Sequence, residues 1–380
     1  MSRKMLNASR RDFLKGLACA ALAPGHLPAP APLAATTRGA AFEFVSVLEH
    51  EALIGAHDIE IRGTLVFVAG KANKPLGRKA GRFAILDIAD PAKPSVTGML
   101  TEEDDVGLHN AQTVLLMGDI CLLGSDDLLA IDIAEPRAPK IVTRVRHQKI
   151  ARINGMIQCG SAVVAANKSG CLDVFDVSDP REPEFVGALD TRALGDLQSP
   201  HDIARFGPDH VVVPSAGKNV PVHFGIYEVS KEGATLLPIE NWHLAGTISS
   251  ETLAGANRIV TDARYAYVAC HYSNRIGVID LAKPRSPELV ATLPTVGAEP
   301  DGLTLDNGVL FVGAGKTVEA IDVSTPERPV SLAHFEGEPI FSTPKNGRAG
   351  NAHDLVVRDG LVHVTAQPDG RIGILRFRHM

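Results

Sequence analysis

A short sequence pattern recurs five times along the chain and limits the fold more than any other feature. In each copy, alternating apolar residues lead to an aspartate, and a turn with two prolines separates this run from a second apolar run. The five aspartates are Asp87, Asp132, Asp176, Asp280 and Asp322. Alternation with a period of two predicts a β-strand, and proline cannot donate to a strand ladder. Each pair of prolines therefore marks the turn between two strands.

Two degenerate copies extend the series to seven. Residues 224–230 keep the strand, but Lys231 and its neighbours replace the prolines, and residues 371–377 end the chain before any following strand. Two further strand-like runs precede each copy, as at residues 258–262 and 266–270. Each unit therefore contains four short strands and spans roughly 44–56 residues, the length expected of a β-propeller blade.

The two ends of the repeated region complement each other. The last unit lacks its outer strand, whereas the apolar run at residues 42–48 precedes the first unit and has no partner. Pairing of this run with residues 372–377 would close a ring and remove two exposed sheet edges. We therefore predict an all-β, seven-bladed propeller of four-stranded antiparallel blades, closed by the N-terminal strand. A pair of β-sandwiches and a β-solenoid are the competing folds, and the unpaired strands at both ends favour the ring.

The repeated strand-Asp-x-x-x-Pro-x-x-Pro-strand segments resemble those of the LVIVD-repeat β-propeller family. The resemblance covers nearly all of the chain after residue 40 and implies a propeller fold. Most members lie outside the cytoplasm, and the resemblance implies little about activity. The fourth blade departs from the family pattern because it lacks the prolines and carries a long insertion.

The first forty residues indicate an export signal. Arg10 and Arg11 are followed by Asp12-Phe13-Leu14-Lys15 and a short apolar run, which is typical of a bacterial twin-arginine (Tat) signal peptide. The run is shorter than the roughly 20 apolar residues of a membrane span, and an amphipathic first helix is the alternative. We predict a signal and cleavage region at residues 1–40, a propeller domain at 41–380, a periplasmic or secreted location, and no transmembrane segment in the mature chain.

Composition excludes some classes of partner and cofactor. The formal net charge is −6 and the sequence has no basic stripe, so we expect no nucleic-acid binding. The apolar fraction of 45% excludes a disordered chain. Four cysteines follow the signal and lie in or beside apolar strands, where we expect buried free thiols: Cys121, Cys159, Cys171 and Cys270. The sequence contains no Cys-x-x-Cys motif, so we expect no thiolate metal site.

Polar residues recur just before the inner strand of each predicted blade. Because the inner strands surround the central channel, ring symmetry would gather these distant side chains at one channel mouth. In blade order they are His57, His109, Asn154, His201, Asn257, Asp301 and His353. Imidazoles beside carboxylate or amide oxygens suit Zn, Cu, Mn or Fe. We predict a divalent transition metal held by His57, His109, His201 and His353, and the alternative at each position is a structural turn residue.

The remaining polar positions complete a functional hypothesis. Asp301, Asn154 and Asn257 would orient a small polar substrate, and His271 would carry a proton. His271 lies in a loop between second and third strands, and such loops open on the same face and also supply Lys71 and Lys168. The hypothesis is a metal-assisted lyase, hydrolase or oxidase. The alternative is a non-catalytic scaffold that binds a ligand or an envelope protein through this face, while the opposite face, with its proline turns, is expected to be structural.

Overall fold

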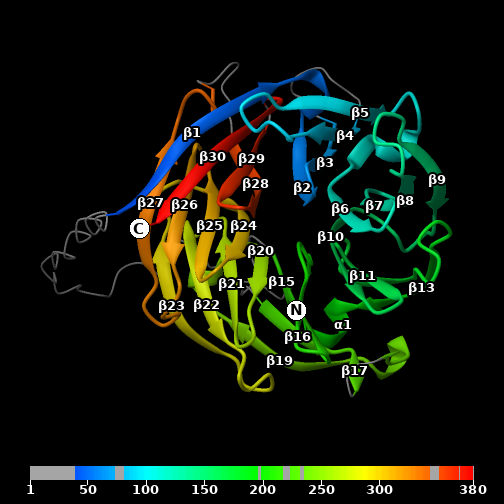
Figure 1. Ribbon diagram of the computed structural model, residues 1–380. Coiled ribbons are helices and arrows are strands. Elements are labelled where there is room, and N and C mark those ends of the chain that lie inside the picture. Colours follow the sequence, from blue (N-terminus) through cyan, green and yellow to red (C-terminus); the bar gives the residue numbers. More distant parts are fainter. Residues whose placement is uncertain are drawn as a thin grey trace, which may run out of the picture. The chain divides into compact units, whose positions relative to one another are not determined.

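Seven four-stranded antiparallel sheets follow one another along the chain and surround a common axis (Figure 1). This confirms the predicted propeller. The computed structural model describes residues 39–72, 81–195, 198–216, 223–231, 235–342, 351–367 and 369–379. Nearly all of the predicted signal segment therefore lies outside the described residues. The blades belong to one unit, Thr36–Met380.

The strands run from the axis outward in each blade. Blades 1 to 3 consist of β2 (Ala56–Arg62), β3 (Leu65–Gly70), β4 (Arg82–Asp87) and β5 (Ser95–Thr101); β6 (Thr113–Met117), β7 (Ile120–Gly124), β8 (Leu128–Asp132) and β9 (Lys140–Val145); and β10 (Ile153–Cys159), β11 (Ala162–Asn167), β12 (Cys171–Asp176) and β13 (Glu184–Asp190). Blade 4 consists of β14 (Ala204–Phe206), β15 (His210–Pro214), β16 (His223–Glu228) and β19 (His243–Ser249).

Blades 5 and 6 consist of β20 (Ala256–Thr261), β21 (Tyr265–Cys270), β22 (Arg275–Asp280) and β23 (Glu288–Pro294), and of β24 (Pro300–Asp306), β25 (Val309–Ala314), β26 (Thr317–Asp322) and β27 (Val330–Glu336). Blade 7 consists of β28 (Asn351–Arg358), β29 (Leu361–Gln367), β30 (Arg371–His379) and β1 (Ala40–Glu49). Short helices precede some inner strands or fill connections: η1 (Glu51–Leu53), η3 (Val106–Asn110), α1 (Thr191–Gly195), η4 (Ile239–Asn241) and η5 (Glu251–Leu253).

The repeat aspartates shape the turns between third and fourth strands. The carboxylate of Asp87 accepts a hydrogen bond of 2.8 Å from the backbone N–H of Ala89, two residues later. The same bond recurs at the other four repeat aspartates, Asp132, Asp176, Asp280 and Asp322. Asp and Asn side chains commonly stabilise turns in this way. The apolar residue between donor and acceptor is Ile88 in blade 1, and its side chain is buried. Its backbone N–H donates to the carbonyl oxygen of Thr64, in the first hairpin of the same blade.

Blade 4 keeps its strands without this turn. Glu228 stands in the position of the repeat aspartate, and a small hairpin of β17 (Ser230–Lys231) and β18 (Thr235–Leu236) replaces the proline turn. The predicted departure of this blade from the repeat is therefore confirmed.

The ring closes as predicted. Strand β1 pairs antiparallel with β30, with Phe42 opposite Phe377 and Leu48 opposite Ile372. The core is divided among the seams between neighbouring blades, and the closing seam packs Ile372 and Ile374 of blade 7 with Val66 of blade 1. Apolar burial at this last seam holds the first and last sheets together.

Two further predictions concern cysteines and membrane spans. The four predicted thiols are free, and three are buried, whereas Cys171 is partly exposed. Within the described part of the chain, no helix has both the length and the apolar character to cross a membrane.

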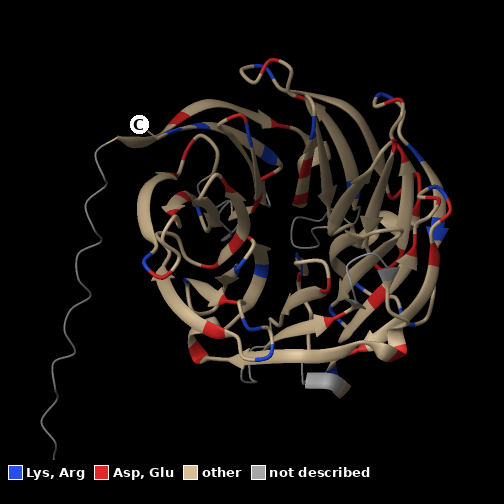
Figure 2. Cartoon of the chain, turned by 60° about the horizontal axis from the view of Figure 1, so that its bottom comes forward, with Lys and Arg blue, Asp and Glu red and all other residues tan. Residues whose placement is uncertain are grey.

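Lys and Arg are interspersed with Asp and Glu around the propeller (Figure 2).

Candidate functional site

Polar residues at the starts of the inner strands meet around one end of the axis. The rings of His57 and His353, from blades 1 and 7, lie with their centroids 4.0 Å apart. Asn257 Nδ2 of blade 5 donates to Asp301 Oδ1 of blade 6 over 2.8 Å. We call the following residues the axial cluster: His57, Lys71, Gln112, Asn154, Lys168, His201, Asn257, His271, Asp301 and His353.

In blade 2, the residue equivalent to His57 is Gln112, and the alignment on His109 was wrong. The backbone N–H of Val114 donates to Asp58 Oδ2, as the N–H of Ile59 donates to Asp354 Oδ2. Val114 and Ile59 are therefore equivalent, and Gln112 lies two residues before Val114. His109 instead lies in the last turn of helix η3, where it is half-exposed and pairs with Glu102.

A fixed spacing in the sequence identifies the correct residue. In four blades, a side chain seven residues before the axial position accepts a hydrogen bond from the N–H two residues after itself. The pairs are His50 and His57, Asp105 and Gln112, His147 and Asn154, and Ser250 and Asn257. Such capping side chains are visible in a sequence, and their spacing would have selected Gln112 over His109.

Backbone carbonyls fix the proton positions on two histidines. His57 Nδ1 lies 2.8 Å from the carbonyl oxygen of Gln112, and His353 Nδ1 lies 2.8 Å from that of His57. A carbonyl oxygen only accepts, so both Nδ1 atoms carry the proton and both Nε2 atoms keep a lone pair. Burial is the main cause that lowers the pKa of His353 to about 3, although the carboxylate of Asp301 opposes it. Burial, followed by neighbouring positive groups, lowers the pKa of His57 well below its usual value. Both imidazoles are therefore neutral at physiological pH.

The amide of Asn154 fixes the opposite arrangement at His201. Asn154 Nδ2 donates to the carbonyl oxygen of His201 over 2.7 Å and lies 3.0 Å from its Nδ1. His201 Nδ1 therefore accepts, and its Nε2 carries the proton. The amide oxygen of Asn154 is buried and has no hydrogen-bond partner among the described residues. Buried polar atoms of this kind are rare and often belong to ligand sites.

Three aspartates next to axial positions connect neighbouring blades. Asp58, Asp202 and Asp354 each accept a hydrogen bond from a backbone N–H of the next inner strand, at 2.8, 3.0 and 3.1 Å. They therefore anchor the strands and do not orient the imidazoles through hydrogen bonds.

Arg258 occupies the corresponding position in blade 5. Its guanidinium lies across the axis, 3.4 Å from the carbonyl oxygen of His57 and 3.5 Å from Asp58 Oδ1. Burial alone would lower its pKa, but the carboxylates of Asp354, Asp58 and Asp202 raise it, so this group is always charged. Arg258 is thus the counter-charge of the axial aspartates, a role that the sequence alone did not indicate.

Two lysines follow the second strands of blades 1 and 3. Lys168 Nζ lies 3.4 Å from the side-chain oxygen of Gln112, which joins blade 3 to blade 2. Burial is the main cause that lowers the pKa of Lys71 to about 8 and that of Lys168 to about 7. The charge of Arg258 lowers the pKa of both lysines further, and the charge of Lys71 also lowers that of Lys168. The carboxylate of Asp301 raises both pKa values. An anion placed among these groups would relieve the repulsion.

Asp301 collects hydrogen bonds from two neighbouring blades. His271 Nδ1 of blade 5 lies 3.2 Å from Asp301 Oδ1, and Asn257 also donates to this oxygen. Burial alone would raise the pKa of Asp301, but the bond from His271 and the neighbouring imidazoles hold it below its usual range. A carboxylate held in this way orients an imidazole for proton transfer.

The predicted metal ligands are brought together only in part. His57 and His353 are adjacent, whereas His201 is engaged by Asn154, and His109 lies away from the axis. Among the described residues, no group of three or more His, Cys, Asp or Glu side chains is placed to hold a metal ion. The Nε2 atoms of His57 and His353 are the groups in the cluster that fit a metal best.

Comparison with known proteins identifies the repeat. The LVIVD repeat family model matches residues 162–191, which contain strands β11, β12 and β13 of blade 3. The chain thus carries an LVIVD repeat, which confirms the resemblance seen in its sequence. No curated protein matches the sequence at a significant level.

Solved propellers resemble the fold at very low sequence identity. Raptor from Chaetomium thermophilum is 9% identical with a TM-score of 0.66, and the match covers 89% of this chain and 30% of Raptor. The WD40 propeller domain of Doa1 is 12% identical with a TM-score of 0.62, covering 88% and 96%. A functionally unknown protein from Desulfotomaculum acetoxidans is 13% identical with a TM-score of 0.55, covering 75% and 86%. At these identities the likeness concerns the fold alone.

Proposed function

We propose that the axial cluster binds a small anionic molecule and transfers a proton to or from it. The observation that supports this most is the convergence of Lys71 and Lys168 with the paired side chains of His271 and Asp301. The lysines would hold a carboxylate or phosphate, and the imidazole, oriented by Asp301, would act as general acid or base. The buried amide oxygen of Asn154 would accept a hydrogen bond from a hydroxyl group of the substrate.

The binding step can be tested with simple anions. Calorimetric titration of the protein with phosphate, acetate, succinate and citrate should detect binding of at least one of them. The Lys71→Met/Lys168→Met double variant should weaken it by about tenfold or more, as expected for the loss of charge-assisted hydrogen bonds. Lys93→Met, which changes an exposed lysine in a turn, is the matched control. Binding that survives the double variant would refute the assignment.

The lysine pKa values predict a pH dependence of this binding. Lys168, with a pKa of about 7, loses its charge before Lys71, with a pKa of about 8. Anion affinity should therefore fall as the pH rises from about 6 to 9, and Lys168→Arg should move the fall to higher pH, because arginine stays charged. Affinity that is constant across this range would contradict the role of the lysines.

Catalysis is tested separately from binding. Products formed from a panel of small hydroxy acids, esters and phosphate esters would be followed by NMR with the wild type and with His271→Asn. Turnover by the wild type that falls at least about a hundredfold in the variant would support the proton-transfer role. Binding of anions without turnover would favour a non-catalytic scaffold.

The metal-assisted form of this proposal is supported by the neutral imidazoles of His57 and His353, whose Nε2 lone pairs could bind a divalent transition metal. Elemental analysis of the purified protein would test it. A stoichiometric metal that is lost in His57→Asn/His353→Asn would support this form, and a protein without stoichiometric metal after growth with Zn, Cu, Mn and Fe would refute it.

A further inference from the structure

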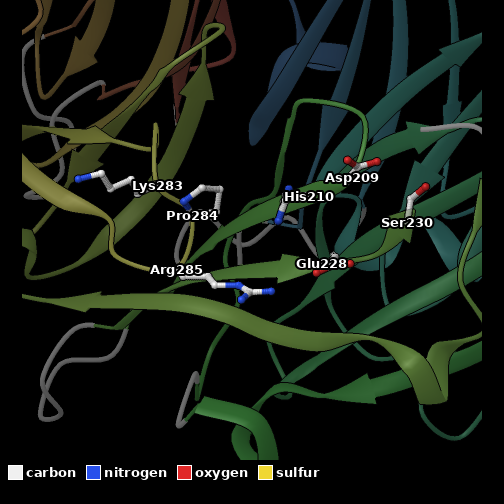
Figure 3. A pocket seen from close by; sticks show the side chains of 7 residues that line it. All are labelled: Asp209, His210, Glu228, Ser230, Lys283, Pro284 and Arg285. Atoms are coloured by element: carbon white, nitrogen blue, oxygen red, sulfur yellow. The ribbon is translucent and has the colours of Figure 1, made fainter. Parts of the chain in front are cut away.

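The face opposite the axial cluster carries a cavity between blades 4 and 5. Its volume is about 600 Å³, within the range of small-molecule sites. It is lined by Asp209, His210, Glu228, Ser230, Lys283, Pro284 and Arg285 (Figure 3). These residues come from the first hairpin of blade 4, the end of its third strand and its strand β17, and from the proline turn of blade 5. This face was expected to be purely structural.

The cavity lies where blade 4 breaks the repeat. In the seam between blades 2 and 3, Arg181 of the proline turn binds the repeat aspartate Asp132 of the preceding blade over 2.8 Å. Arg285 follows Pro284 as Arg181 follows Pro180, so its equivalent partner would be Glu228. Glu228 instead pairs with His243 of its own blade over 3.1 Å, and Arg285 has no ion pair within the described part of the chain.

Blades 4 and 5 pack closely beside the cavity, although Arg285 and Glu228 do not form an ion pair. Gly246 of β19 packs directly under the carbonyl of Pro284, where a side chain would collide at 2.0 Å. Gly98 makes the same approach to Pro136 between blades 1 and 2. Blade 5 therefore sits against blade 4 in the usual way, and the open space results from the altered turn of blade 4.

The charges in the cavity are divided between two sides. Figure 3 shows the guanidinium of Arg285 pointing toward Glu228 and His210, with Asp209 beyond them. The Oδ1 atom of Asp209 is buried and has no hydrogen-bond partner among the described residues. A buried carboxylate oxygen without a donor is costly unless a ligand supplies one.

We propose that this cavity is a binding site for a small zwitterion, a free amino acid. Its carboxylate would bind the guanidinium of Arg285, which is suited to this group. Its ammonium group would donate to Asp209 and Glu228, and would supply a donor to the Oδ1 atom of Asp209. A simple anion or cation would satisfy one side of the cavity and be repelled by the other. The proposal is independent of the function of the axial cluster.

Titration calorimetry of the full chain with L-alanine, L-glutamate, L-lysine and 4-aminobutyrate tests this site. At least one should bind with a Kd below about 1 mM. Its N-acetylated and amidated derivatives should each bind at least about tenfold more weakly, because each loses one of the two charges. Absence of binding, or equal binding of the derivatives, would overturn the proposal.

Variants assign the binding to the cavity. Arg285→Gln and Asp209→Asn should each weaken it by about tenfold or more. The control Arg181→Gln, in the equivalent turn of blade 3, should leave it unchanged. Unchanged affinity in both Arg285→Gln and Asp209→Asn would place the ligand elsewhere and refute the assignment.

Discussion

Two sets of aspartates do different work in this propeller. The repeat aspartates, such as Asp87, bond a backbone N–H two residues later in their own turn. The axial aspartates Asp58, Asp202 and Asp354 bond the inner strand of the next blade, and Asp354 does so across a sequence separation of 295 residues. The first set shapes a local turn at the surface, whereas the second connects blades around a buried charge.

The difference explains why the two sets look so unlike in the sequence. A turn needs its aspartate in every blade that makes the same turn, and so the residue recurs with its prolines. Asp58, Asp202 and Asp354, which lie next to axial positions, have one guanidinium, that of Arg258, as their common counter-charge. Their arrangement follows from the ring as a whole.

The largest effect should come from Arg258. Arg258→Met leaves the axial carboxylates without their buried counter-charge, and removal of one partner from a buried ionic group typically costs about 3–5 kcal/mol. Urea unfolding would measure this loss of stability. Arg181→Gln, which breaks the exposed pair with Asp132, is the control and should leave the free energy of unfolding unchanged within error. Equal effects of the two variants would remove the distinction between the axis and the turns.

An intermediate effect is expected when single aspartates are compared. Asp354→Ala leaves the buried N–H of Ile59 without an acceptor, which should cost about 1–3 kcal/mol. Asp87→Ala exposes the N–H of Ala89 to water, so its cost should be about 1 kcal/mol or less. Thermal and urea unfolding would measure the loss of stability in each variant. A larger loss in Asp87→Ala than in Asp354→Ala would contradict this prediction.

The smallest effect at neutral pH is expected from His353→Asn, which copies the residue that blades 3 and 5 carry at this position. Burial keeps His353 neutral in the folded state, with a pKa of about 3, whereas in the unfolded state it binds a proton near pH 6.5. Wild-type stability should therefore fall as the pH drops from about 6.5, and the variant should lose less, by up to about 1.4 kcal/mol per pH unit.

The turns should respond to acid in a different range. Backbone and side-chain hydrogen bonds from Ser324 lower the pKa of Asp322, so its contribution to stability is present above its ordinary value of 3.8 and is lost below it. Unfolding curves between pH 7 and 3 would separate the two ranges. If His353→Asn and the wild type followed the same curve down to pH 4, the axial histidine would not be responsible for the first loss.

The fold could be predicted almost completely from the sequence. The seven units, their four strands and the pairing of β1 with β30 all follow from alternation, proline turns and unpaired ends. These signals are local, because strand patterning and turn chemistry depend on neighbouring residues. The departure of blade 4 was visible for the same reason, although the cavity beside Arg285 was not.

The axial positions were predicted for six blades and missed in blade 2. The inner strand of blade 2 follows helix η3, which contains His109. The axial position of this blade was therefore assigned to His109, three residues before Gln112. Side-chain identity was a weaker guide than the distance from the capping residue Asp105.

The number of blades, their turns and the closure of the ring can be predicted from the sequence, since each depends on residues that are close along the chain or on two ends left without partners. Which polar groups meet follows from the packing of the blades. The contacts of Arg258 with blade 1, of His271 with Asp301 and of His57 with His353 join blades through space. Their geometry depends on the packing of all seven sheets around one axis.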